Sequence, residues 1–192
     1  MPTDDRMQAS LPGAAPPPPR GARPLAAGEI ALAEAAFGNG IDYGRVRMRN
    51  GPGFNPIAFF AFMLGNPAIT LVATLYFKGR YCADFSAAAA RDKMLFMHEM
   101  THVWQYRALG VAPFFLRYAR ELAACGFRRR ALYAYVTGET PFGGATLEAQ
   151  AEMVGDYQGA MLSGDEAGAR WIAKNLAGSG LFGQPARAAE EG

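Results

Sequence analysis

The chain has 192 residues, of which 51% are hydrophobic and 19% are charged, and its formal net charge is +2. This length suits one domain with its own hydrophobic core, and so weak a positive charge gives no reason to expect a nucleic-acid partner. The two cysteines, Cys82 and Cys125, are too few for a disulfide framework. We interpret them as reduced or core residues, although pairing in an oxidising compartment stays open.

The N-terminal segment begins MPTDDRMQAS, with early acidic residues and without the apolar stretch of a secretory signal. We therefore expect synthesis in the cytoplasm. Export would require a route that does not depend on a signal peptide. Residues 1–27 also contain LPGAAPPPPRGARP. Proline at this density favours a disordered or polyproline-like tail, most simply a linker, ahead of the folded domain.

The first ordered elements are predicted in residues 28–49. Residues 28–38 place Ile30 and Phe37 at helical spacing, and the glycine at the end of this stretch can terminate a helix. Further on, Val46 and Met48 alternate with arginines, which predicts a short strand with its basic residues on the solvent face.

An apolar run at residues 54–77 raises the question of a membrane span. The GNP sequence at 65–67 divides the run into halves that are too short to span as one helix. The second half, AITLVATLYF, is rich in β-branched and aromatic residues, which favour a buried strand. We interpret the run as protein core and a membrane partner as disfavoured: a loop over the core is followed by one strand or a tight hairpin.

The rest of the chain is predicted to be mainly helical. The clearest helix lies within residues 81–110, with Asp84 or Ser86 as its N-cap and Gly110 at its end. The other predicted helices cover residues 112–127, 145–162 and 165–178. From residue 178 the pattern weakens, and we expect a flexible C-terminal tail at residues 178–192.

Both histidines of the chain lie in the stretch FMHEMTHVWQYR, inside the clearest helix. His98 and His102 are four residues apart and therefore share a helix face, so that two neutral imidazoles can bind one Zn²⁺. Glu99 projects to the flank of the pair, where it can act as general base toward a water held on the metal. Two structural histidines that happen to have this spacing are the alternative.

A hydrolytic zinc site needs a third protein ligand, and no histidine remains to supply it. The stretch LEAQAEMVGDY places Glu148 and Glu152 four residues apart on one face of a predicted helix. We interpret Glu148 as the third ligand and Glu152 as the acceptor of the free N–H of a histidine ligand, with Asp156 as the reserve for that acceptor. An acidic helix face in water is the alternative, and Cys82 and Cys125 are weaker ligand candidates.

HEMTH followed by EAQAE resembles the gluzincin pattern of metallopeptidases, in which the first glutamate of an E-x-x-x-D motif completes H-E-x-x-H. The match holds at His98, Glu99, His102 and Glu148 and departs at Glu152, where the family has aspartate. More narrowly, DFS, MLFMHEMTHVWQ and LEAQAE resemble the Vgr-related proteins, small bacterial proteins with metallopeptidase domains similar to those near toxins and contractile injection systems.

The resemblance implies a zinc-dependent peptidase in a zincin-like α+β domain at residues 28–177, mostly helical with a small sheet beside the histidine helix. It implies a protein or peptide substrate, and partners among secretion-system or toxin proteins. An edge strand within 68–77 would pair with extended substrate, although a central strand is also open. Gluzincins commonly add a tyrosine or histidine as oxyanion donor. Tyr157 is the candidate here, ahead of Tyr133 and Tyr135, although buried tyrosines are commonly core residues.

Two other functions stay open. A non-catalytic accessory or adaptor protein of a secretion system could keep zinc for stability, as the proline-rich tail and the lack of a spare histidine suggest. A membrane-associated peptidase could use residues 57–77.

Overall fold

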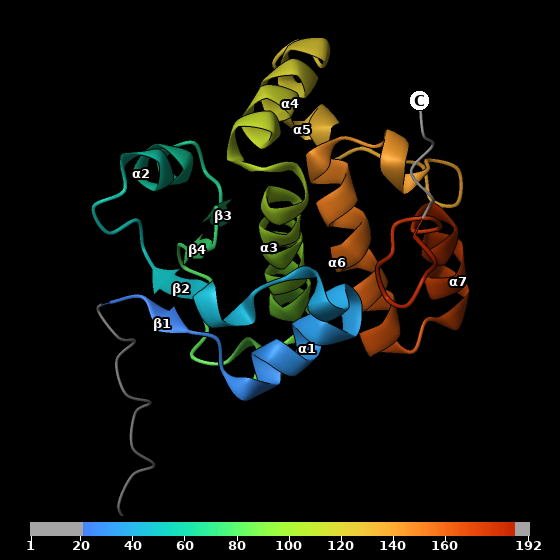
Figure 1. Cartoon of the computed structure of the whole chain (residues 1–192), viewed down its shortest axis with the longest axis horizontal. Coiled ribbons are helices and arrows are strands. Elements are labelled where there is room, and N and C mark those ends of the chain that lie inside the picture. Colours follow the sequence, from blue (N-terminus) through green and yellow to red (C-terminus); the bar gives the residue numbers. More distant parts are fainter. Residues whose placement is uncertain (1–20, 187–192) are drawn as a thin grey trace, which may run out of the picture.

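The computed structural model describes residues 21–186 (Figure 1). It confirms the predicted α+β class, because helices predominate and accompany one small sheet. The helices are α1 Ala27–Phe37, α2 Pro56–Met63, α3 Ala90–Leu109, α4 Val111–Ala124, α5 Arg129–Leu132, α6 Leu147–Ser163 and α7 Glu166–Asn175. The strands are β1 Arg23–Pro24, β2 Arg47–Asn50, β3 Ala68–Leu71 and β4 Thr74–Phe77.

The sheet has the strand order β1-β2-β4-β3. β3 and β4 form an antiparallel hairpin, as one of the two sequence interpretations predicted, while β2 runs parallel to β4. β3 is an edge strand of this sheet and lies against α3. The alternation in β2 is as predicted, since Val46 and Met48 are buried while Arg47 and Arg49 are only partly covered.

The core lies around α3, which runs through the centre of the molecule with α6 alongside it (Figure 1). Met97 of α3 is fully buried. A glycine brings the two helices close together, because a Cβ on Gly155 of α6 would lie 3.1 Å from the backbone oxygen of Met94 on α3. This approach places the first turn of α6 within reach of the middle of α3.

The apolar run at 54–77 differs from its prediction in the first half, where a helix replaces the expected loop. The Asn55 side chain caps α2 by accepting hydrogen bonds from the backbone N–H groups of Ile57 and Ala58. Because α2 is apolar on every side, its sequence cannot tell which face is buried, and few of its side chains reach the core. The exposed apolar residues of this segment are Phe54, Ile57, Phe59, Phe60, Met63 and Leu64. The core interpretation is therefore wrong for this half.

None of the helices within residues 21–186 combines the length and apolar character needed to cross a membrane.

Two further details differ from the sequence predictions. Asp84 caps the short 3₁₀ turn Phe85–Ala87 rather than α3, which begins after Ala89. Leu25 and Leu181 are both buried in the core, so the packed part of the chain extends beyond residues 28–177 at each end. Residues 1–20 of the expected proline-rich tail and 187–192 of the expected C-terminal tail lie outside the described residues.

A buried ion pair holds the N-terminal strand. Glu29 is fully buried and lies 2.7 Å from both Nη1 and Nη2 of Arg23. Replacing Arg23 by alanine would leave this carboxylate without its cation, which costs about 3–5 kcal/mol in such pairs. We expect that loss in the free energy of unfolding, measured with urea.

The matched control for this prediction is Arg170→Ala. Arg170 lies 3.7 Å from Glu166, and both side chains are largely exposed, so its loss should cost no more than about 1 kcal/mol. Equal effects of the two substitutions would contradict an anchoring role for the buried pair.

Candidate metal centre

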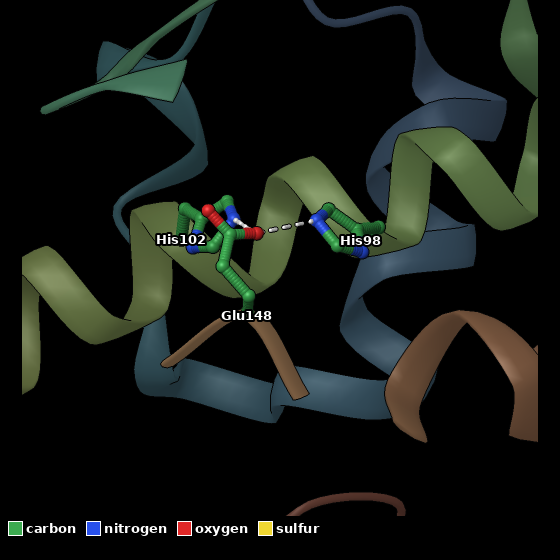
Figure 2. A group of neighbouring side chains, drawn as sticks. All are labelled: His98, His102 and Glu148. Carbon is green, nitrogen blue, oxygen red and sulfur yellow. Dashed lines mark hydrogen bonds and ion pairs between the residues drawn. The ribbon is translucent and has the colours of Figure 1, made fainter. Parts of the chain in front are cut away.

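The two histidines of α3 and the first glutamate of α6 converge (Figure 2). One oxygen of Glu148, Oε2, lies 3.3 Å from Nε2 of His98 and 3.3 Å from Nε2 of His102. Each side chain offers one nitrogen or oxygen atom as a ligand, and these three atoms lie within 4.8 Å of one another. All three residues are buried. The arrangement is therefore a group of two imidazoles and one carboxylate suited to hold a single cation.

The local sequence accounts for the position of Glu148. Thr146 caps α6, because its hydroxyl accepts a hydrogen bond from the N–H of Ala149. The N–H of Leu147 is taken by the Glu121 carboxylate of α4 at 2.9 Å. These contacts fix the start of the helix, so its second residue faces α3.

Each histidine also has an outer partner at Nδ1. Glu152 Oε2 lies 3.2 Å from Nδ1 of His98, at the position the sequence assigned to it. Nδ1 of His102 lies 2.8 Å from Oε1 of Gln105, a residue that the sequence analysis did not single out. The signal was available in HEMTHVWQ, because a glutamine three residues after a histidine shares its helix face.

Glu99 lies beside the cluster, and its carboxylate forms no hydrogen bond or ion pair with either of the two histidine rings. Its Oε2 accepts a hydrogen bond of 2.7 Å from the hydroxyl of Thr70, which is buried in the edge strand β3. The carboxylate is thus held between the sheet and α3. It stays available to a molecule bound in the adjoining cavity, which Glu99 helps to line.

The tyrosines are placed differently from the sequence expectation. Tyr157 packs against Phe182, with ring centroids 4.6 Å apart, instead of lining the cavities. It follows Glu148 by nine residues on one helix, which is two and a half turns, so it faces the opposite side. Tyr133 instead stacks beside His98, with centroids 5.9 Å apart. Asp156, the reserve candidate for accepting the N–H of a histidine, instead accepts a 2.6 Å hydrogen bond from the hydroxyl of Tyr135.

Two cavities meet at the cluster. His98, Glu99 and Tyr133 line both of them. The first, of about 500 Å³, lies between α2, β3 and α4. Its apolar lining includes Ile57, Phe60, Leu64, Phe114, Phe115 and Leu122. The second, of about 370 Å³, has a charged lining that includes Arg91, Glu152 and Asp156. A bound chain could therefore pass the cluster with different surroundings on either side.

Burial and charge shift the pKa values of the cluster in opposite directions. Burial lowers the pKa of His98, but hydrogen bonding to Glu148 and Glu152 outweighs it and raises the pKa to about 10. Burial likewise lowers the pKa of His102, and the charge of Glu148 reverses this into a net rise. Burial would raise the pKa of Glu148, but the two histidines bring it below its usual range. Burial raises the pKa of Glu99.

These shifts predict that zinc binding releases protons. A raised folded-state pKa means that the charged ring stabilises the metal-free protein below the pKa of free histidine, about 6.5, and that this contribution is lost as pH rises. For His98 it disappears as pH passes through about 10. Because zinc needs both rings deprotonated at Nε2, binding near neutral pH should release protons, of which His98 supplies about one and His102 a further contribution.

Calorimetric titration in two buffers of different ionisation enthalpy measures this release. The apparent zinc affinity should rise with pH between about 6.5 and 10. Zinc uptake without net proton release, and with a flat pH dependence, would contradict the assignment of the two histidines.

Comparison with known proteins gives two significant similarities, while no protein-family model matches the chain. The first is to the type VI secretion system spike protein VgrG2b of Pseudomonas aeruginosa, 36% identical over 87 residues. That segment is 44% of this chain and only 8% of the spike protein. The second is to the solved effector domain of Pseudomonas aeruginosa VgrG2b, with a TM-score of 0.59, 27% identity and coverage of 81% of this chain and 82% of that domain. The chain is therefore a homologue of the VgrG2b effector domain, in agreement with the Vgr-related resemblance of its sequence.

Proposed function

We propose that the protein is a zinc-dependent peptidase of gluzincin type. The observation that carries the proposal is the convergence of His98, His102 and Glu148 within 4.8 Å, with Glu99 beside them on a cavity wall. Two imidazole nitrogens and one carboxylate oxygen form a donor set typical of catalytic zinc, and Cys82 and Cys125 take no part in the cluster. The residues therefore fit the metal that the motif implies.

Zinc bound by these three side chains would supply a Lewis acid that polarises a peptide carbonyl and makes water a better nucleophile. Glu99 would accept the proton of the attacking water and deliver it to the leaving amine. The raised pKa of its buried carboxyl suits a group that must take up and return a proton near neutral pH. Thr70 would hold this carboxylate in place through its 2.7 Å hydrogen bond.

Tyr133 is the better candidate for the oxyanion donor that Tyr157 was expected to provide. It lines both cavities beside His98, and burial raises the pKa of its hydroxyl. The phenol therefore stays protonated and can donate a hydrogen bond to the oxygen that becomes negative in the transition state.

The substrate would be an extended peptide segment. β3 is paired on one side by β4, and its residues Ala68 to Leu71 line the larger cavity. A peptide that continued the sheet there would receive main-chain hydrogen bonds and pass over the cluster. The apolar lining of the cavity favours a substrate with a bulky apolar side chain near the bond to be cut.

The homology supports a place in a bacterial secretion system, because the related domain belongs to a spike protein of the type VI system. We propose that this protein is likewise an effector, synthesised in the cytoplasm and exported with secretion-system proteins. A non-catalytic adaptor that keeps zinc for stability is the competing hypothesis, and it predicts zinc binding without cleavage.

The test is to measure zinc content and cleavage on the same preparation. We expect about one zinc per chain, cleavage of unfolded protein substrates beside apolar residues, loss of cleavage with a chelator, and recovery when zinc is returned. A protein that takes up no zinc would exclude the whole proposal. One that binds zinc, melts at a higher temperature and cuts nothing would favour the adaptor.

A further inference from the structure

Two buried glutamines connect His102 to α6 in a continuous chain of hydrogen bonds. Gln105 is 1% exposed and Gln150 is 4% exposed. Nε2 of Gln105 donates to the backbone oxygen of Leu147 and to Oε1 of Gln150, both at 2.9 Å. Nε2 of Gln150 donates in turn to the backbone oxygen of Phe142 at 2.8 Å. We call these two side chains the glutamine relay.

The backbone carbonyl groups that the two glutamines contact determine the orientation of their side-chain amides. A backbone carbonyl can only accept a hydrogen bond, so the amide nitrogen of Gln150 must face Phe142 and that of Gln105 must face Leu147. A rotated Gln105 amide would bring two oxygen atoms within 2.9 Å of one another. The oxygen of Gln105 is therefore the atom that faces Nδ1 of His102, at 2.8 Å. Nδ1 must therefore carry a proton, and when the ring becomes neutral its lone pair is left on Nε2, the nitrogen that faces Glu148.

The relay also joins the two helices that carry the cluster. Gln105 belongs to α3, and its two acceptors, Leu147 and Gln150, flank Glu148 on α6. One side chain thus contacts a histidine of the cluster and the helix turn that holds the glutamate. The other histidine has no comparable support, because the partner of His98 at Nδ1 is Glu152, whose side chain is 43% exposed.

We propose that Gln105, held by Gln150, is a positioning residue for the metal centre. It fixes the Nδ1–H form of His102 and keeps the start of α6 in register with α3, so that Nε2 of His102 and the carboxylate of Glu148 face one cation. The inference rests on the proposed function for the identity of that cation. The hydrogen-bond relay itself is independent of the metal and can be tested without it.

The experiment compares Gln105→Leu and Gln150→Leu with the wild type and with the control Gln158→Leu. Gln158 is a buried glutamine two turns beyond Gln150 on α6, outside the relay. Zinc affinity is measured by competition with a chromophoric chelator. We expect Gln105→Leu to weaken zinc binding by about 10–100-fold, the usual effect of losing an outer partner of a metal-binding histidine. Gln150→Leu should have a smaller effect and Gln158→Leu none.

The second readout is proton exchange at the histidine rings, followed by NMR with ¹⁵N-labelled histidine. The chain has only two histidines, so each ring can be assigned by comparison with variants at the other. In metal-free and zinc-loaded protein, the Nδ1 proton of His102 should exchange more slowly than that of His98. Gln105→Leu should abolish this difference, and Gln105→Glu, which keeps an acceptor for the ring, should restore it in part.

The outcomes separate the two proposals. If the wild type binds no zinc but the Nδ1 proton of His102 exchanges slowly, the zinc-peptidase proposal is excluded and the relay is retained. A wild type that binds zinc, with affinity and ring exchange unchanged in Gln105→Leu, would overturn the relay alone. If Gln105→Leu does not fold, Gln150→Leu decides, because it touches neither histidine and must still speed the exchange at His102.

Discussion

Replacement of Glu99 by glutamine is expected to lower the rate of peptide hydrolysis by about 10²–10⁴-fold, the range contributed by general acid–base catalysis. Glutamine has nearly the same shape and can still accept the hydrogen bond of Thr70. It cannot take a proton from water at neutral pH. Zinc content should remain that of the wild type, because Glu99 is outside the three-residue cluster.

The matched control is Glu152→Gln, the same chemical change at the outer partner of His98. It should reduce zinc affinity and leave much of the hydrolysis rate once zinc is saturating. Hydrolysis by Glu99→Gln at the wild-type rate, in a preparation that loses activity with a chelator, would remove Glu99 from the mechanism.

A second large effect is expected for Glu148→Gln on zinc binding. The carboxylate oxygen lies 3.3 Å from both Nε2 atoms and supplies the only negative charge of the cluster. Its loss should weaken zinc binding by more than the roughly 100-fold upper range found for outer partners. Chelator competition measures this loss, and activity should fall with the fraction of zinc-loaded protein.

The same substitution has a consequence for the metal-free protein. Hydrogen bonding to Glu148 is the largest of the influences that raise the pKa of His98, so the ring should titrate well below about 10 in the variant. NMR titration of the two histidines follows this directly. Zinc binding and histidine titration that both match the wild type would show that Glu148 is not the third ligand.

The residues of the cluster could be predicted because helical spacing translates directly into a shared face. His98 and His102, and then Glu148 and Glu152, needed only the four-residue rule and the coordination chemistry of zinc. That rule could not predict the distance between the histidine pair and the glutamate pair. It depends on how closely α6 approaches α3, which Gly155 permits through packing that a single sequence does not report.

The sequence could neither prefer Tyr133 to Tyr157 nor assign a role to Thr70, because both contacts depend on how separate elements pack together. Tyr133 follows the short helix α5, and Thr70 reaches Glu99 from a strand far away in sequence. The error at Tyr157 was avoidable, since its spacing from Glu148 already places it on the other side of α6. The exposure of α2 was not predictable, because a uniformly apolar helix carries no sign of which face meets the core.

The order of strands also determines how the protein can be joined to other parts. β1 and β3 lie at opposite edges of the sheet, and the chain enters the folded region through β1. A module fused ahead of residue 21 would therefore be tethered on the flank remote from β3. Its attachment point would be separated from the cavity-lining strand β3 by β2 and β4.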